Sequence, residues 1–389
     1  MIVDVAEILF WLSLGLLTAT WLLYPAMLCV LCQFRREPPA RLQVTRRRQM
    51  TVLVAAHNEE RNIDARIANI IDHPPSDFDL EVLIASDGSS DATFAIAHAW
   101  VARDPRVSAF QTSGARGKVA AHNQGVVAAR GEIVVFTGSD FFTDAETEFD
   151  PQFLDTIGHA FDNPSVGFAT GEIVWRNRSG ELTGENFSHY WRYEKWLRRM
   201  ETKLGIHALG SGACSAVLRH LYRPVPSSAD QDFITPLDAI LQGYRTIYVP
   251  EARAYDFVSE TVMGEFKARI RMTAKNFANT FAHWGAQSLL WRPAVSLGLI
   301  FHKLFRWLTP YFALLVLFCG TLVLIHEQGT VPIQLVVTTG IAALLYGSVG
   351  AVCPKLPLAG SLWSFMVANA AFAIGVFRAL TGGVPTAFR

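Results

Sequence analysis

An uncharged apolar stretch from about Ile8 to Val30 limits the possible folds of this chain most. Its main part, LFWLSLGLLTATWLLYPAMLCV, is close to the roughly 20 apolar residues that a helix needs to cross a bilayer. A hydrophobic content of 51% with only 17% charged residues also fits a membrane protein. The stretch lacks a basic start and a small-residue cleavage site, so we expect a retained anchor and not a removed signal peptide.

Three further apolar runs follow later in the chain, at roughly Pro310–Ile325, Val331–Val352 and Leu358–Leu380. The loop HEQGT between the first two has no Lys or Arg, whereas the loop CPKLP carries Lys355. Six arginines follow the first apolar stretch, against a single Glu: Arg35, Arg36, Arg41, Arg46, Arg47 and Arg48. By the positive-inside rule, the residues after the first span are expected to face the cytoplasm.

The stretch LGLIFHKLFRWLTP before the second apolar run mixes aromatic, apolar and basic residues. This mixture suits an amphipathic helix in the membrane interface, although an ordinary helix continuing into the span is the alternative. The predicted organisation is an anchor at 1–33, a basic linker at 34–49, a globular domain at 50–256, interface helices at 257–308, three spans at 309–383 and a tail at 384–389.

The charge balance and the cysteines argue against a nucleic-acid-binding protein and against a fold held by disulfides or by a cysteine-bound metal. The formal net charge is zero, so the composition implies no nucleic-acid partner. The five cysteines lie mostly in or beside the apolar spans, and the pair in CVLC has no second ligand pair. We therefore expect neither a disulfide framework nor a cysteine metal site.

Between the apolar ends, strand-like and helix-like segments alternate. The runs TVLVAAHN, LEVLIASDG, GEIVVF and YRTIYVPEA read as short strands, and ERNIDARIANII and KVAAHNQGVVAAR lie between them with a helical pattern. This alternation predicts an α/β domain with a largely parallel sheet. Ligands of such sheets bind at the carboxyl ends of the strands, so polar clusters there are candidate sites.

Three polar clusters occupy such positions. His57–Glu60 follows TVLVAA, Ser86–Asp91 follows LEVLIA, and Gly117–Asn123 opens a helix. Asp and Ser in the second cluster can instead form a turn and a helix cap. The glycine and lysine of the third suit an anion at a helix start, although a solvated lysine is the alternative and the spacing is not that of a Walker A loop.

In this order, the three clusters resemble the nucleotide-sugar half of the family 2 glycosyltransferases, which have the GT-A fold. The resemblance covers the globular domain and, less specifically, the membrane parts. It is greatest for the membrane-anchored, cellulose-synthase-related bacterial branch. It implies a Rossmann-like α/β domain with a mostly parallel sheet and transmembrane helices at both ends.

The resemblance also implies roles for individual residues. Glu59, in AHNEE, and Asp87, in SDGSSD, would hold the ribose and uracil of a UDP-like nucleotide. Lys118, in GKVAAHN, would lie near the diphosphate or the base, and Asn58 and Asn123 would orient these groups.

The segment ALGSGACSAVLRHLY resembles the family's G-A-x-x-A-x-R segment, which lines the acceptor side of the pocket around Gly212 and Ala213. The alternative is that these small residues only let a helix pack closely.

Further along, Gln231–Asp232 resembles the family's Glu-Asp or Asp-Asp pair at the start of the acceptor-side helix. Inverting transfer needs a carboxylate that takes the proton of the acceptor hydroxyl, and Asp232 is the candidate for this general base. Gln231 is uncharged, so this chain has one negative charge fewer at the pair than the family motif. Asp230 restores one, but it can instead be the N-cap of the helix.

The segment EFKARIRMTAKNF lies where processive relatives carry Q-x-x-R-W. Ala268 stands for the Gln, Arg271 is kept, and Met272 replaces the Trp. The resemblance therefore favours a non-processive enzyme. Arg269 and Arg271 are candidates to neutralise the diphosphate, and lipid-facing basic residues are the alternative.

The family's D-x-D metal motif has two possible positions in VVFTGSDFFTDAETEFDP. Counting forward from Gly131 gives Asp140 alone, whereas counting back from Asp150 gives Asp144 and Glu146. Two carboxylates bind a hard cation better than one, which favours the second position. The ion, Mg²⁺ or Mn²⁺, would bridge the diphosphate.

The function implied by the resemblance is an inverting glycosyltransferase in the inner membrane of a bacterium, for cell-surface or exopolysaccharide synthesis. Its partners would be a nucleotide-sugar donor, a lipid-linked or glycan acceptor, membrane lipids and other polysaccharide-assembly proteins. A nucleotide-sugar-binding scaffold with weak catalysis is the alternative. A dinucleotide-dependent oxidoreductase is excluded because no G-x-G-x-x-G follows a strand.

Overall fold

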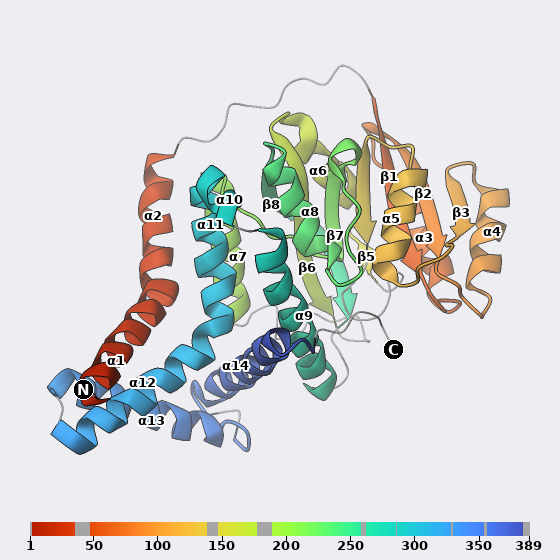
Figure 1. Ribbon diagram of the computed structural model, residues 1–389. Coiled ribbons are helices and arrows are strands. Elements are labelled where there is room, and N and C mark those ends of the chain that lie inside the picture. Colours follow the sequence, from red (N-terminus) through yellow and green to blue (C-terminus); the bar gives the residue numbers. More distant parts are fainter. Residues whose placement is uncertain are drawn as a thin grey trace. The chain divides into compact units, whose positions relative to one another are not determined.

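The computed structural model describes residues 2–35, 47–137, 147–176, 189–257, 262–284, 286–327, 330–353 and 356–383. The chain divides into two compact units (Figure 1). We call the unit of Leu31–Ser259 and Ala282–Val295 the sheet unit. The unit of Met1–Val30, Glu260–Phe281 and Ser296–Val384 is the helical unit.

In the described part of the sheet unit, eight strands form one sheet in the order β3-β2-β1-β4-β7-β6-β8-β5. Neighbouring strands are parallel except where β7 pairs with β4 and β6, and where β5 pairs with β8. The strands are β1 (Arg48–Ala56), β2 (Phe78–Ser86), β3 (Val107–Gln111), β4 (Ile133–Thr137), β5 (Glu148–Phe149), β6 (Val166–Arg176), β7 (Cys214–Leu218) and β8 (Arg245–Phe257). The mostly parallel α/β sheet predicted from the sequence is confirmed.

Helices cover this sheet and connect its strands. They are α3 (Ile63–Asp72), α4 (Thr93–Arg103), α5 (Lys118–Ala128), α6 (Phe153–His159), α7 (His189–Leu204) and α8 (Gln231–Leu241), with 3₁₀ turns η2 (Ala160–Asp162) and η4 (Arg219–Leu221). Helix α10 (Ala286–Trp291) belongs to the same unit but follows the last strand. Each parallel crossover from β1 to β2 and from β2 to β3 contains one helix, as parallel pairing requires.

The residues of β1 explain why both faces of the sheet are covered. Val52 and Val54 belong to a buried core with Ile67 of α3 and Phe153 of α6. Leu53, between them, belongs to a second buried core with residues of α5 and α8. Successive side chains of a strand point to opposite faces, so a strand with consecutive apolar residues, as at 52–56, needs a helical layer on each side.

The described part of the helical unit contains α1 (Ile2–Thr18), α12 (Phe305–Glu327), α13 (Val331–Val349) and α14 (Ala359–Leu380), with most of α9 (Val262–His283). Phe10 of α1 packs with Cys319 of α12 and Val337 of α13. A side chain at Gly320 would lie 2.5 Å from Val337, so glycine permits the close contact of α12 and α13.

Four helices in the described residues are long and apolar enough to cross a membrane: Ile2–Phe34, Pro293–His326, Val331–Val349 and Ala359–Leu380. The first contains α1, the π-helical turn η1 (Ala19–Leu23) and α2 (Tyr24–Phe34). The second runs without a break through α11 (Pro293–Leu299), the π-helical turn η5 (Ile300–Leu304) and α12. The amphipathic stretch before Pro310 thus continues into the span, which is the alternative stated for it above.

Candidate functional site

The carboxyl ends of the parallel strands lie on one edge of the sheet unit. The last residues of β1 and β2, Ala56 and Ser86, are register partners. The last residue of β4, Thr137, is paired with Cys214, the first residue of the antiparallel strand β7. The polar clusters that follow β1 and β2 therefore lie on the same edge as the glycine-rich segment that precedes β7.

Two loops on this edge, after β1 and after β2, are locked to each other by hydrogen bonds. The backbone N–H of Ser90 donates to Asn58 Oδ1 (2.8 Å), and the N–H of Asn58 donates to Ser89 Oγ (3.2 Å). Asn58 has a φ of +57°, a left-handed conformation that Asn tolerates better than most residues. The side-chain oxygen of Asn58 thus joins the two loops and fixes the position of their neighbouring residues.

Glu60 and Asp91 also join the loop after β1 to the loop after β2. The N–H of Glu60 donates to Asp91 Oδ2 (3.1 Å), and the N–H of Ala92 donates to Glu60 Oε2 (3.2 Å). Asp91 Oδ1 also accepts the N–H of Thr93, the first residue of α4 (3.0 Å). Asp91 therefore forms the turn and helix start that were the alternative interpretation of this cluster.

Asp87 lies at the centre of the edge and is only 6% exposed. Its Oδ1 accepts the Thr112 hydroxyl (2.8 Å) and its Oδ2 accepts the backbone N–H of Gly117 (2.6 Å). An ionised carboxylate has about four lone-pair positions, so acceptor capacity remains for a ligand. Because both protein donors are neutral, they hold the carboxylate without cancelling its charge.

Glu59 is also buried, at 4% exposure. Its N–H donates to the Thr93 hydroxyl (2.6 Å), and its Oε2 accepts the Asn62 side-chain amide (2.9 Å). Its carbonyl accepts the N–H groups of Asn62 and Ile63, where α3 begins. Glu59 thus connects the start of α3 to the start of α4.

The start of α5 brings positive charge to Asp87. Lys118 is the first residue of α5, and the preceding Gly117 has a φ of +108° that favours glycine. The Arg116 guanidinium lies over Gly88. Its central carbon would be 3.0 Å from a Cβ atom added at that glycine. Arg116 was not among the residues predicted from the sequence, although a second cation two residues before Lys118 in RGK was a usable signal.

Asn123, on α5, is fully engaged with the protein. Its Nδ2 donates to the Val225 carbonyl (2.9 Å), and its Oδ1 accepts the N–H of Val225 (2.9 Å) and the hydroxyl of Tyr222 (2.8 Å). Burial raises the pKa of Tyr222, so this hydroxyl stays a donor. Asn123 therefore holds the segment that leads from β7 to α8 against α5.

The glycine-rich segment lies against the first turn of α8. Gly212 and Ala213 are buried directly before β7. The N–H of Gly210 donates to the Asp232 carbonyl (3.1 Å), and a side chain at Gly210 would lie 2.4 Å from that oxygen. Close helix packing, the alternative interpretation of this segment, thus holds at Gly210.

The first turn of α8 carries the acceptor-side candidates. Asp230 is the N-cap residue, and its carbonyl accepts the N–H groups of Phe233 and Ile234. Asp232 follows within the first turn and is half-buried, where the positive end of the helix dipole favours a carboxylate. Gln231 is 5% exposed, and its Nε2 has no partner among the described residues.

Burial raises the pKa of Cys214, beside the end of β4, to about 12. Its thiol is therefore neutral at physiological pH and is not a nucleophile for this edge.

Five predicted residues are not placed at this site. Asp140, Asp144 and Glu146 lie at 138–146, outside the described residues. Arg269 and Arg271 lie on the part of α9 that belongs to the helical unit, where Arg269 pairs with Glu265. The two alternatives for the metal ligands therefore stay predictions, as do the roles of the two arginines.

Two protein-family models match the chain. "Glycosyl transferase family 2" matches residues 51–225, and "Glycosyl transferase family group 2" matches residues 141–347. The first match covers the strand-end clusters and the glycine-rich segment, and the second continues through α8 and into α13.

Two curated relatives are identical to this chain at about a quarter of the aligned residues. An N-acetylglucosaminyltransferase from Bradyrhizobium diazoefficiens is 24% identical over 247 residues, which are 60% of this chain and 50% of that protein. A poly-beta-1,6-N-acetyl-D-glucosamine synthase from Staphylococcus aureus is 27% identical over 227 residues, 57% of this chain and 53% of that protein. The chain spans about half the length of these relatives.

A solved structure has the same fold over nearly the whole chain. The mannosyltransferase PcManGT from Pyrobaculum calidifontis, in complex with GDP-Man and Mn²⁺, superposes with a TM-score of 0.69 at 21% identity. The match covers 96% of this chain and 99% of that one. The predicted GT-A-type fold is thereby confirmed.

Proposed function

Because the chain belongs to the family 2 glycosyltransferases, we propose that it transfers a sugar, with inversion, from a nucleoside diphosphate to a lipid-linked or polysaccharide acceptor. The observation that carries this proposal is the contact of Asp87 Oδ2 with the N–H of Gly117. It joins a buried acceptor for a nucleobase to the helix start that carries Lys118. A nucleotide needs both a base acceptor and a cationic place for its diphosphate.

On the donor side, Asp87 would accept a base N–H, with Glu59 toward the ribose. The start of α5, with Lys118 and Arg116, would attract the diphosphate, since helix starts favour anions. Asn58 and Asn123 would act by position: the first fixes the loops after β1 and β2, and the second fixes α5. We propose a UDP-like nucleotide.

On the acceptor side, Asp232 would be the general base, beside Gly212 and Ala213. Its carboxylate takes the proton of the acceptor hydroxyl while that oxygen bonds to the anomeric carbon. The bond from that carbon to the diphosphate oxygen breaks, and the nucleoside diphosphate leaves. The amide of Gln231, whose Nε2 lacks a partner among the described residues, is proposed to bind a sugar hydroxyl.

A divalent ion, Mg²⁺ or Mn²⁺, would be held by Asp144 and Glu146 or by Asp140, because β4 ends at Thr137 on the candidate edge just before this acidic stretch. Bound there, it would offset the negative charge of the diphosphate. Hard carboxylate oxygens are the ligands that both ions prefer.

The four apolar helices favour a multi-pass protein, and the arginines after the first favour a sheet unit on the cytoplasmic side. Ala268 and Met272 stand where processive relatives carry Gln and Trp, so we propose transfer of single sugars and not chain extension. Arg269 and Arg271 are proposed to contact the diphosphate or lipid phosphates.

The test uses the purified chain with Mn²⁺ and a panel of UDP- and GDP-sugars, and it measures release of nucleoside diphosphate. Asp232→Asn should lower turnover by about 10²–10⁴-fold, the usual contribution of a general base. Asp230→Asn, in the same turn, is the matched control and should retain most activity. Equal loss in both variants, or loss only in the control, would contradict the assignment of Asp232.

One observation favours a second function, a nucleotide-sugar-binding scaffold. The first position of the acidic pair is the uncharged, buried Gln231. A scaffold would bind nucleotide sugars tightly but release no nucleoside diphosphate with any acceptor tested. Metal-dependent turnover that Asp232→Asn abolishes would exclude it.

A further inference from the structure

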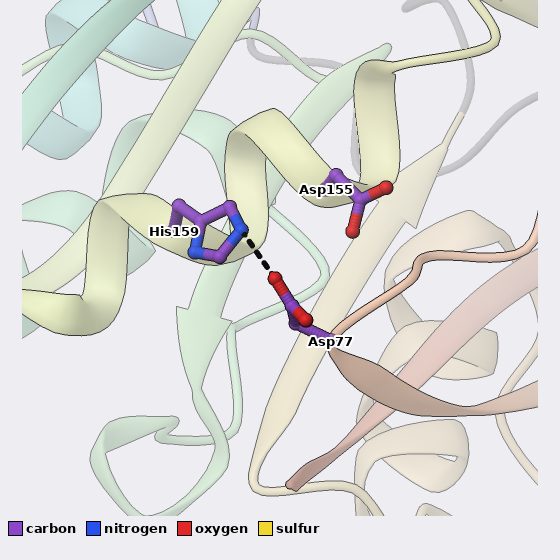
Figure 2. A group of neighbouring side chains, drawn as sticks. All are labelled: Asp77, Asp155 and His159. Carbon is purple, nitrogen blue, oxygen red and sulfur yellow. Dashed lines mark ion pairs between the residues drawn. The ribbon is translucent and has the colours of Figure 1, made fainter. Parts of the chain in front are cut away.

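A group of metal-ligand side chains lies at the opposite edge of the sheet, where β1 and β2 begin. Asp77 precedes β2, and Asp155 and His159 lie on α6 (Figure 2). One ligand atom from each residue lies within 4.8 Å of those of the other two. We infer that this group binds one divalent transition-metal ion of the zinc type, separate from any ion of the transfer reaction.

The spacing of the closest two ligand atoms fits such an ion. His159 Nε2 and Asp77 Oδ2 are 3.2 Å apart. Bonds of about 2.0 Å from zinc to N and O place two tetrahedral ligand atoms about 3.3 Å apart. Only a small movement of Asp155 is then needed to complete a three-residue set, with the remaining position open to water.

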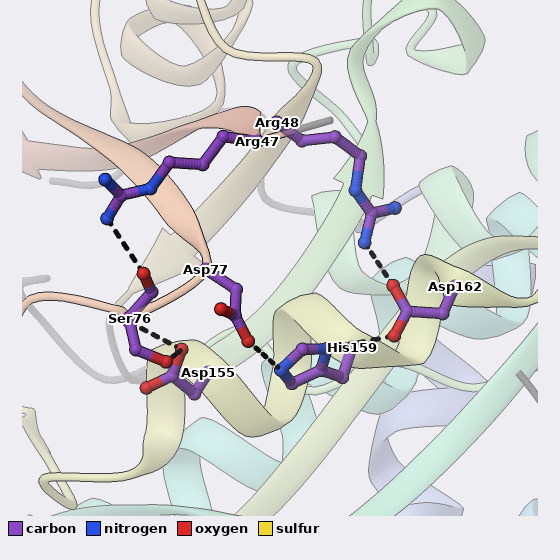
Figure 3. A network of polar contacts seen from close by, with 7 residues as sticks. All are labelled: Arg47, Arg48, Ser76, Asp77, Asp155, His159 and Asp162. Carbon is purple, nitrogen blue, oxygen red and sulfur yellow. Dashed lines mark hydrogen bonds and ion pairs between the residues drawn. The ribbon is translucent and has the colours of Figure 1, made fainter. Parts of the chain in front are cut away.

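The other nitrogen of His159 is held as it is in metal-ligating histidines. Its Nδ1 lies 2.9 Å from Oδ2 of Asp162, whose carboxylate is 9% exposed and also paired with Arg48 (Figure 3). A carboxylate that accepts Nδ1–H fixes the tautomer and leaves the Nε2 lone pair for a metal.

With this tautomer, the approach of His159 to Asp77 is favourable only if a cation is shared between them. A neutral His159 that donates Nδ1–H to Asp162 directs the Nε2 lone pair toward a carboxylate oxygen of Asp77. Two acceptors at 3.2 Å repel each other unless a cation lies between them. That cation is either a metal ion or a proton on Nε2, and these are the two outcomes that the experiment must separate.

The third ligand and the charges favour the metal ion. The N–H and hydroxyl of Ser76 both donate to Asp155 Oδ1 (2.8 and 3.1 Å), which orients the carboxylate and leaves Oδ2 available. Arg48 balances Asp162, so Asp77 and Asp155 supply two negative charges for a divalent ion. An imidazole with two carboxylates suits zinc, whereas Mg²⁺ prefers oxygen ligands and water.

The position of the group assigns the ion a structural role. The nine residues of β2 separate this group from Asp87 by about 30 Å, at about 3.3 Å per residue. The ion would link α6 to the start of β2, and it would therefore stabilise the sheet unit without touching the donor.

The experiment titrates the metal-free full chain, in detergent micelles, with Zn²⁺ by isothermal calorimetry. Asp77→Asn should bind one Zn²⁺ fewer per chain than the wild type, and Zn²⁺ should raise its unfolding midpoint less. Asp79→Asn is the matched control, since its side chain is similarly exposed (57% against 64%) and it pairs with Arg47 instead. The acidic stretch at 140–146 is unchanged in every variant. Zinc bound there therefore contributes equally to every titration and does not affect the difference between the variants and the wild type.

A second variant, Asp155→Asn, keeps an oxygen for Ser76 while it removes the ligand charge. It should also bind one Zn²⁺ fewer. Equal zinc stoichiometry and affinity in the wild type, Asp77→Asn and Asp155→Asn would overturn the inference. His159 would then be an imidazolium between two carboxylates.

Discussion

Asp87 and Asp91 at one edge of the parallel strands are held in the opposite way from Asp162 and Asp104 at the other edge. At the carboxyl ends, Asp87 and Asp91 accept hydrogen bonds from neutral hydroxyl and backbone N–H groups. At the amino ends, Asp162 is paired with Arg48 and Asp104 with Arg106. Neutral donors hold a carboxylate in place while its charge stays available to a ligand, whereas ion pairs neutralise it. Asp87 is thereby suited to a ligand, whereas the pairs of Asp162 and Asp104 with arginine are suited to stability.

The largest expected effect concerns stability at the amino ends. Asp162→Asn breaks a largely buried pair with Arg48 and removes the negative charge that faces His159 Nδ1. Removing one member of a buried pair costs about 3–5 kcal/mol, because the remaining charge stays buried. Thermal unfolding in metal-free buffer should show a lower midpoint, while the nucleotide affinity of the folded protein stays unchanged. A loss of nucleotide affinity without loss of stability would reverse the roles of the two edges.

The next effect concerns binding at the carboxyl ends. Asp87→Asn keeps an acceptor for Thr112 but places an amide group against the N–H of Gly117. A hydrogen bond to a charged group contributes about 1.5–3 kcal/mol, so nucleotide affinity should fall by roughly 10- to 150-fold. Calorimetric titration with UDP or GDP measures this loss, and Asp79→Asn at the other edge is the control. Unchanged affinity in Asp87→Asn would remove this residue from the donor site.

The smallest effect is the pH dependence of a pair at the amino end of β3. A hydrogen bond from Arg106 lowers the pKa of Asp104, so the stabilisation is present above the ordinary aspartate pKa of about 3.9. It is lost as the pH falls through the lowered value. A partly exposed pair contributes about 0.2–1 kcal/mol. The unfolding midpoint of Asp104→Asn should therefore be lower than that of the wild type at about pH 6, and the two midpoints should converge at low pH. A difference that stays constant with pH would contradict this assignment.

Much of the fold was predictable because it depends on local patterns. The mainly apolar run TVLVAA predicted β1, and its burial on both faces follows from apolar side chains at consecutive positions from Val52 onward. The apolar spans were recognisable by length alone, and four such helices are present among the described residues. The stretch at 297–310 shows the limit: its composition suits both an interface helix and the continuous helix that the structure contains.

The contacts of the candidate site were less predictable because they join residues that are distant in sequence. Asp87 was found from its strand-end motif, but Thr112 and Gly117, which hold it, belong to another loop. The motif around Asn123 does not reveal its engagement with Val225, 102 residues away. At the other edge, nothing local connects Asp77 with His159; the packing of α6 beside the start of β2 brings them together.

The central claim is that the carboxyl ends of β1, β2 and β4 bind the nucleotide sugar. The most direct test is a cryo-electron microscopy map of the chain in lipid nanodiscs with Mn²⁺ and a non-hydrolysable UDP-sugar. We predict density for the base beside Asp87, for the diphosphate near Lys118, and for Mn²⁺ against carboxylates of the 140–146 stretch. Nucleotide density at any other place, such as the edge with Asp77 and His159, would contradict the claim.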